Sequence, residues 1–299
     1  MPKNPQSLEY WRRFFRDLYR ARAVRSQWRL RIPLKSYFGK WRKKMDVQAL
    51  EEWPGGYVVL NDEDFLYLPR NKDVLTGMRL TYPIEALPVI GKFCPPGAVA
   101  FDVGANLGEW SLLMAKSIGP SGKLYSFEPL PFLAEAIDKT LKANGFKQAR
   151  VIAGAVSNKS GEATLSVDYR HTGKSRIGTL ESDGETERLA VKTLTLDDFS
   201  NSENLERLDF IKIDVEGHEA AVIEGAKDVL SKFRPTLILE AGMETEDDRR
   251  NIRNILTSLE YVIVGITIDH GIVEVDWDDF LLLRGPFTDT FSNVLFVPG

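Results

Sequence analysis

The sequence predicts an α/β fold with a mostly parallel central sheet, and three observations lead to that prediction. The chain has 299 residues, 43% of them hydrophobic and 27% charged, which is the composition of a folded globular protein. From Val99 onward, short apolar runs alternate with amphipathic segments of helical length, the order that βαβ units produce. Glycines and charged residues follow several of these runs directly, so the runs have the length of strands. We therefore expect an α/β domain over 99–299, preceded by a hairpin region at 53–98 and an N-terminal arm at 1–52.

The individual elements follow from hydrophobic periodicity. Strands are expected at 99–103, 123–127, 150–156, 208–214, 235–240, 261–267 and 292–297, and helices at 108–117, 130–144, 218–231 and 246–259. Further strands at 163–167 and 189–195 flank a polar loop, 168–188, that we expect to be a lid on the substrate side. The runs 57–60 and 65–68 are separated by four polar residues and predict a β-hairpin.

The cysteine content and the apolar runs bound the class of protein. Cys94 is the single cysteine, cannot form an intramolecular disulfide, precedes a proline and is interpreted as structural. One cysteine and three histidines give no zinc-type ligand spacing, and we predict no metal ligands. The first residues lack the apolar core of a signal peptide, and no apolar stretch approaches the ~18 residues of a spanning helix. We therefore expect a cytoplasmic protein, with membrane association left open.

Charge is divided unevenly along the chain. Residues 1–45 hold 14 basic and two acidic residues, a local net charge of +12, whereas the remainder holds 25 basic and 41 acidic residues, or −16. Apolar side chains recur at helical spacing between the arginines and predict a basic amphipathic helix; they are Leu8, Trp11, Phe15, Leu18 and Tyr19. Docking of residues 8–45 on an anionic membrane and packing of the helix on the acidic body both remain open. Nucleic-acid binding is a third, less favoured interpretation.

Two motifs with chemical potential follow successive strands. The run VAFDVGANLG places Gly104 and Gly108 in a turn between strand and helix, where the backbone can approach a ligand closely, with Asp102 beside it. Its G-x-N-x-G spacing differs from the G-x-G-x-x-G of nicotinamide-binding folds and disfavours a dinucleotide. Glu128 ends the next strand in SFEP, where an acid can accept both hydroxyls of a ribose. The alternative is that Glu128 is favoured only by the dipole of the helix that follows.

A third motif, IKIDVEGHE, ends the strand at 208–214. Strand alternation puts Lys212, Asp214 and Glu216 on one face, and buried charges there require partners. One interpretation is an ion pair between Lys212 and Asp214, with acids capping the next helix. The other interpretation adds His218 as a general base, because an imidazole titrates near neutral pH.

Together, VAFDVGANLGEW, SFEP, IKIDVEGHE and the closing NVLFVP resemble the FkbM-type family of S-adenosylmethionine-dependent methyltransferases over roughly residues 55–299. The resemblance implies the class I methyltransferase fold, a Rossmann-like sheet of seven strands whose last strand, here 292–297, is antiparallel. It also implies a role for each residue of the three motifs. Gly104, Asn106 and Gly108 would line the methionine moiety, Asp102 would lie near its sulfonium and amino groups, Glu128 would hold the ribose, Ala155 and Val156 would lie at the adenine, and Asp214, Glu216 and His218 would face the transferred methyl.

Members of this family methylate oxygens of sugars, glycan ends and macrolide-like products, so the resemblance implies O-methylation of a small-molecule or glycan acceptor. The protein would align the acceptor, exclude water and take up a proton, with His218 or a neighbouring carboxylate as the base. A divalent cation held by Asp214, Glu216 or Glu240 is an alternative that we do not favour, because these acids can pair with basic residues. Two other classes stay open: a nucleic-acid or other N-methyltransferase, and a non-catalytic protein that binds S-adenosylmethionine. The aromatic and acidic run at 277–280 either contacts a polyhydroxyl acceptor or belongs to the end of an element.

Overall fold

The computed structural model describes residues 55–60, 64–70, 86–167, 175–178, 186–268, 271–287 and 292–299. The predicted basic arm, including residues 8–45, lies outside these ranges, and so does most of the predicted lid. No helix within the described ranges is long and apolar enough to cross a membrane.

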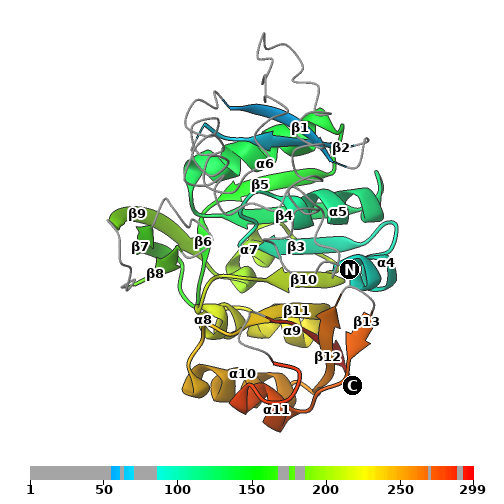
Figure 1. Ribbon diagram of the computed structural model, residues 1–299, viewed down its shortest axis with the longest axis vertical. Coiled ribbons are helices and arrows are strands. Elements are labelled where there is room, and N and C mark those ends of the chain that lie inside the picture. The colour runs from blue at the N-terminus through cyan, green and yellow to red at the C-terminus, as the bar shows by residue number, and fades with distance from the viewer. Residues whose placement is uncertain are drawn as a thin grey trace, which may run out of the picture.

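An eight-stranded sheet forms the centre of the molecule, with the strand order β13-β12-β14-β11-β10-β3-β4-β5 (Figure 1). Its strands are β3 (Val99–Val103), β4 (Lys123–Glu128), β5 (Ala149–Ala153), β10 (Phe210–Ile213), β11 (Thr236–Ala241), β12 (Tyr261–Ile268), β13 (Gly271–Val273) and β14 (Ser292–Pro298). The strands from β5 to β11 are parallel, and β14 is antiparallel to both of its neighbours. The predicted seven-stranded sheet with an antiparallel last strand is confirmed, and β13 adds a short eighth strand at the edge.

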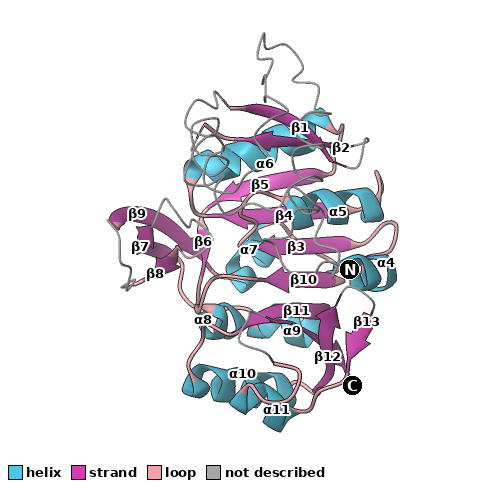
Figure 2. Ribbon diagram, in the orientation of Figure 1, coloured by secondary structure: helices cyan, strands magenta, loops and turns pink. Residues whose placement is uncertain are grey.

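Helices cover both faces of this sheet (Figure 2). One face packs against α4 (Leu87–Phe93), α5 (Glu109–Ile118) and α6 (Pro131–Ala143), and the other against α7 (Leu196–Ser202), α8 (Glu219–Glu224), α9 (Lys227–Phe233), α10 (Glu246–Ser258) and α11 (Trp277–Leu282). Successive residues of a strand point to opposite faces, so Ala100 packs in the first core and Phe101 in the second. Burial on both faces explains why the central strands are nearly continuous apolar runs.

Two predicted elements are divided in the structure, and a glycine lies at each division. The strand expected at 150–156 leaves the central sheet at Gly154, and the residues after it form β6 (Ala155–Val156) in a second sheet. The helix expected at 218–231 is broken at Gly225, where an added Cβ would lie 2.2 Å from the carbonyl oxygen of Ser157. So close a backbone approach requires a residue without a side chain.

The second sheet has the strand order β6-β9-β7-β8 and stands beside the carboxyl ends of the central strands (Figure 1). It contains β7 (Gly161–Val167) and β9 (Glu187–Leu194), which confirm the strands predicted at 163–167 and 189–195. Its edge strand β8 (Arg176–Ile177) lies within the stretch predicted to be a lid, and residues 168–174 and 179–185 of that stretch lie outside the described residues.

Three short helices escape the sequence analysis, because six or seven residues are too few for helical periodicity to show: α4, α7 and α11. The run at 277–280 is the first turn of α11, which Asp276 caps by accepting from two backbone N–H groups. Trp277 and Phe280 both pack on the ring of Phe296. These contacts support the structural interpretation of that run.

The predicted hairpin is present and packs on α6. Its strands β1 (Gly56–Leu60) and β2 (Asp64–Leu68) pair antiparallel, and their apolar side chains join the core between the sheet and α5. The N–H groups of Phe65 and Tyr67 donate to the side chains of Asn144 and Thr140, at 2.8 and 2.9 Å. In the same layer, Cys94 is fully buried and burial raises the pKa of its thiol to about 12, which agrees with a structural role.

Candidate active site

A pocket of about 640 Å³ of empty space, counting its open mouth, lies at the carboxyl ends of β3, β4 and β10, and the second sheet forms one of its walls. Ligands of open α/β sheets bind at this edge of the sheet. Of the residues predicted from the sequence, Gly104, Asn106, Glu128, Ala155, Val156, Asp214, Glu216 and His218 line it. Asp102 and Gly108 do not line the pocket, and their surroundings explain why.

The glycine turn forms the floor of the pocket because two backbones meet there. Gly104 has a φ of 76°, and an added Cβ would lie 1.7 Å from the carbonyl oxygen of Asp214. Asn106 also has a positive φ, 51°, and its buried Oδ1 accepts no hydrogen bond from the described residues. Gly108, with a φ of 86°, precedes α5 and faces Ile137 of α6, whose side chain would lie 3.2 Å from an added Cβ. Gly108 therefore brings two helices together, and Gly104 and Asn106 are the turn residues that face the pocket.

Glu128 joins the glycine turn to the start of α6. Its two carboxylate oxygens accept from the N–H groups of Asn106 and Leu130, each at 2.9 Å. The side chain is 5% exposed, and burial raises its pKa to about 7. Glu128 thus has a structural role in the protein, and the same carboxylate borders the pocket.

Asp102 lies beneath the pocket in a buried charge network. It is fully buried, accepts from the hydroxyl of Ser111 at 2.5 Å, and lies 3.8 Å from the Nζ of Lys212. The same ammonium group pairs with Asp214 at 2.9 Å and donates to the carbonyl of Gly104 at 3.3 Å. Burial disfavours the charge of Lys212, but the carboxylates of Asp214 and Asp102 outweigh that effect and raise its pKa. The predicted Lys212–Asp214 ion pair is confirmed. The contacts of Lys212 with Asp102 and with the carbonyl of Gly104 hold the ends of β3 and β10 together.

The loop after β10 is held in shape by Glu219. Glu216 and Gly217 both have positive φ values, 56° and 91°, so the chain turns sharply between Asp214 and α8. The Oε1 atom of Glu219, a side chain only 1% exposed, accepts from the N–H groups of Val215 and Gly217 at 3.0 and 3.2 Å. Burial raises the pKa of Glu219 to about 7. This clamp fixes the direction in which the loop presents its side chains to the pocket.

His218 precedes the first residue of α8 and lines the pocket beside Ser157. Its Nε2 lies 2.9 Å from the hydroxyl oxygen of Ser157, the residue that follows β6. Burial lowers the pKa of His218, and the positive charge of Arg176 lowers it further. The imidazole is therefore favoured in its neutral form, which can accept a proton.

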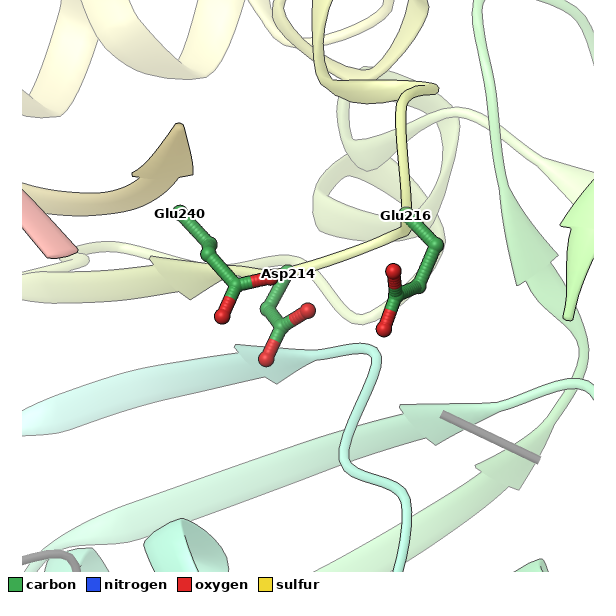
Figure 3. A group of neighbouring side chains, drawn as sticks. All are labelled: Asp214, Glu216 and Glu240. Atoms are coloured by element: carbon green, nitrogen blue, oxygen red, sulfur yellow. The ribbon is translucent and has the colours of Figure 1, made fainter. Parts of the chain in front are cut away.

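Three carboxylates meet where β10 and β11 end. Oxygens of Asp214, Glu216 and Glu240 all lie within 4.8 Å of one another, and Figure 3 shows Asp214 between the other two. Burial, and then the charges of Asp214 and Glu216, raise the pKa of Glu240 well above its usual range. Oxygen-only groups of this kind suit a hard divalent cation. However, Lys212 already balances Asp214, and a protonated Glu240 reduces the repulsion, so the group is stable as it stands.

One corner of the pocket is formed by β8, within the polar loop that the sequence analysis expected on the substrate side. Ser175, Arg176 and Ile177 line the pocket together with Leu165, because β8 pairs with β7 at Leu165. The sequence analysis did not single out these three residues, since only the tertiary pairing brings them to the pocket. In the sequence Glu219 is one of a cluster of acids, and nothing in that pattern predicts its hydrogen bonds to the loop.

Comparison with known proteins identifies the family. The model of the methyltransferase FkbM domain matches residues 102–263. The chain is 26% identical to methyltransferase sdnD of Sordaria araneosa, over 44% of this chain and 61% of the relative. It is 27% identical to 2-O-methyltransferase NoeI of Sinorhizobium fredii, over 55% of this chain and 72% of the relative. It is 22% identical to hexuronic acid methyltransferase AglP of Haloferax volcanii, over 50% of this chain and 59% of the relative. A solved structure, the methyltransferase FkbM of Methylobacillus flagellatus, aligns with 68% of this chain and 44% of its own at a TM-score of 0.45 and 16% identity.

The family match covers more than half of the chain, whereas the chain spans less than two thirds of the length of sdnD and of AglP. The match begins at Asp102 in β3, and it includes the glycine turn and the pocket residues of β4, β6, β8 and the loop after β10. The chain therefore belongs to the FkbM methyltransferase family.

Proposed function

We propose that this protein transfers the methyl group of S-adenosylmethionine to an oxygen atom of a small-molecule or glycan acceptor. The observation that carries the proposal is the convergence of the glycine turn, Glu128 and the Asp214–His218 loop on one pocket. Two relatives, a 2-O-methyltransferase and a hexuronic acid methyltransferase, support an oxygen on a sugar-like acceptor.

In this proposal the cofactor lies along the carboxyl edge of the sheet. Gly104 and Asn106 hold the methionine end, Glu128 holds the ribose, and Ala155 and Val156 border the adenine. When bound, S-adenosylmethionine supplies a methyl group that its sulfonium already activates. Asp102 and Gly108 act from outside the pocket, because Asp102 fixes Lys212 and Gly108 fixes the start of α5.

We assign the proton-accepting role to His218. It lines the pocket, its lowered pKa keeps it neutral near pH 7, and Ser157 orients one ring nitrogen. A general base of this kind contributes about 10²–10⁴ in rate. Asp214 and Glu216 are the alternative bases, but the ion pair with Lys212 makes Asp214 the weaker candidate. Loss of turnover in His218→Gln with intact cofactor binding supports the assignment, and full turnover in that variant rejects it.

The first experiment is calorimetric titration with S-adenosylhomocysteine. We expect micromolar binding that weakens at least tenfold in Glu128→Ala and is unchanged in Glu135→Ala, whose side chain lies on the exposed surface of α6. Because Glu128 also holds two backbone N–H groups, Glu128→Gln and a thermal melt of each variant separate loss of binding from loss of folding. No binding by the unchanged protein would reject the proposal and leave a non-catalytic role.

The same titration and a turnover assay, both in EDTA, test whether cofactor binding or turnover requires a divalent cation. We expect no change, because Lys212 already balances the charge of Asp214. Loss of turnover in EDTA, restored by Mg²⁺, would instead assign a cation to Asp214, Glu216 and Glu240.

For the basic arm, we propose peripheral contact with an anionic membrane through residues 8–45, which would bring the enzyme to lipid-linked or glycan acceptors. The protein is expected to float with phosphatidylserine vesicles and not with phosphatidylcholine vesicles. Replacement of Arg12, Arg13, Arg16 and Arg20 by glutamine should abolish flotation. Equal flotation of the unchanged protein and the arginine-to-glutamine variant would contradict the membrane role. Salt-sensitive binding of RNA by the unchanged protein would favour the nucleic-acid alternative.

A further inference from the structure

One corner of the pocket presents hydrogen-bond donors that have no acceptor among the described residues. Ser175 and Arg176 both line the pocket, and the Oγ of Ser175 and the Nε of Arg176 are buried without a hydrogen-bond partner. Within the described ranges, no carboxylate lies within 4.0 Å of the Arg176 guanidinium, although eleven other ion pairs are present there. Lys212, which lies beneath the pocket, is paired with Asp102 and Asp214.

An arginine in this situation indicates a missing anion. A buried donor without an acceptor is costly, and a charged one more so, unless a ligand completes it. The guanidinium group is planar and presents paired N–H groups that match a carboxylate or a phosphate, and a neighbouring hydroxyl can donate a further hydrogen bond. Ser175 and Arg176 together therefore have the chemistry of an anion-binding corner.

The position of this corner relates it to the acceptor rather than to the cofactor. In the proposed arrangement the carboxylate of the methionine moiety lies by the start of α5, because the first N–H groups of a helix have no intrahelical partner and suit an anion. Arg176 instead lies on β8, and it lines the same pocket as His218. The anion that completes Arg176 would therefore share the pocket with the group that would accept the proton of the acceptor hydroxyl.

We propose that Ser175 and Arg176 select acceptors that carry a carboxylate or phosphate group close to the hydroxyl that is methylated. The inference rests on the proposed function, because it names the substrate class of that same site. Arg176 binds the anion and Ser175 adds a hydrogen bond, so neutral sugars lacking the group bind less tightly.

The test compares three probes on the protein saturated with S-adenosylhomocysteine, at constant ionic strength: sodium glucuronate, glucose 6-phosphate and glucose. We expect at least one of the two anions to bind about tenfold or more tightly than glucose, as a hydrogen-bonded charge requires. Preference for glucuronate over glucose 6-phosphate, or the reverse, tells which anion the corner accepts. Arg176→Gln should remove the preference, and Ser175→Ala should reduce it.

Arg188→Gln is the matched control, because Arg188 and Arg176 pair with the same residue, Ser166, from opposite sides, but Arg188 is exposed and away from the pocket. This variant should keep the preference of the unchanged protein. Equal binding of anions and glucose would overturn the proposal, and so would an Arg176→Gln variant that loses S-adenosylhomocysteine affinity while the preference persists. Failure of S-adenosylhomocysteine to bind at all would reject the methyltransferase function separately. The binding of the three probes is then compared in the absence of S-adenosylhomocysteine.

Discussion

Gly104 is the residue at which the architecture of the site is most tightly constrained. Its φ of 76° and the 1.7 Å approach to the Asp214 carbonyl mean that no side chain fits between β3 and the loop after β10. The fold itself therefore requires glycine at this position, because the ends of two strands meet there, and ligand binding is not the only reason for it.

For Gly104→Ala we expect a loss of stability on the order of 2–5 kcal/mol, from backbone strain and overpacking, and loss of S-adenosylhomocysteine binding. Urea unfolding and calorimetry measure the two effects. Gly91→Ala is the control, since Gly91 lies in α4 with nothing within 4 Å of an added Cβ, and it should be neutral or stabilising by up to about 1 kcal/mol. Equal effects of the two substitutions would contradict this account.

Glu219 should make stability depend on pH. Its pKa rises from 4.5 to about 7 on folding, so the folded protein binds the proton more tightly than the unfolded chain does. The group therefore costs nothing below about pH 4.5 and destabilises the fold increasingly as pH rises towards 7. Glu219→Gln keeps an oxygen for the N–H groups of Val215 and Gly217 without that cost.

We expect the stability of Glu219→Gln, relative to the unchanged protein, to improve by on the order of 2–3 kcal/mol between pH 5 and pH 8. Urea unfolding at both pH values measures this difference. Glu224→Gln, on the same helix, is the opposite case, because hydrogen bonds from Asn158 and Asn251 lower the pKa of Glu224. Glu224 is ionised in both the folded and the unfolded state between pH 5 and pH 8, so the difference in stability between that variant and the unchanged protein should stay constant over this range and should shrink only as pH falls below about 4.5. A pH-independent difference for Glu219→Gln would show that its carboxyl titrates normally.

At the scale of elements, the hairpin is attached through Asn144. This residue follows the last turn of α6, accepts from the N–H of Phe65 at 2.8 Å and donates to the carbonyl of Phe65 at 2.6 Å. One side chain thus satisfies both backbone groups of a strand residue that the sheet partner does not satisfy.

Asn144→Ala should cost about 1–3 kcal/mol, because it leaves both groups of Phe65 without a partner. Hydrogen exchange should show faster opening of β1 and β2 and no change in the central strands. Lys142→Ala, two residues earlier in α6, removes only an exposed ion pair with Asp138 and should have little effect. Uniformly faster exchange throughout the protein would mean that the hairpin is not an independent unit.

The elements that the sequence predicted best are those whose pattern local burial dictates. Central strands buried on both faces are apolar runs, and β3, β4, β10, β11, β12 and β14 appear within two residues of the expected bounds. The pocket residues at the ends of β3, β4 and β10 were predictable too, because parallel strands bring their carboxyl ends to one edge.

What the sequence could not supply depends on contacts between distant segments. The break at Gly225 exists because the backbone at Ser157 approaches it, and the place of Arg176 at the pocket exists because β8 pairs with β7. Asp102 looked like a pocket residue from its place near the end of β3, but its side chain points to the face where Lys212 and Ser111 surround it. Strand alternation alone does not tell which face carries the pocket.

At the scale of the whole molecule, the pocket links two sheets that share few other contacts. The chain leaves the central sheet after β5 and enters the second sheet at β6, where Ala155 and Val156 line the pocket and pair with Thr193 and Leu194 of β9. β9 in turn pairs with β7 from Glu187 to Thr193. A ligand that packs on β6 therefore acts on the strand through which the second sheet is attached.

This connection predicts how binding changes the dynamics of the protein. S-adenosylhomocysteine should slow amide exchange tenfold or more at 155–156, since opening of β6 would require loss of its contacts with the ligand. A smaller slowing should extend through β9 to β7, and β1 and β2, which contact the far side of α6, should exchange as before. Mass-spectrometric hydrogen exchange with and without the ligand measures all three regions. Protection confined to the glycine turn and the Asp214–His218 loop would mean that the adenine does not reach β6, and that the second sheet serves the acceptor alone.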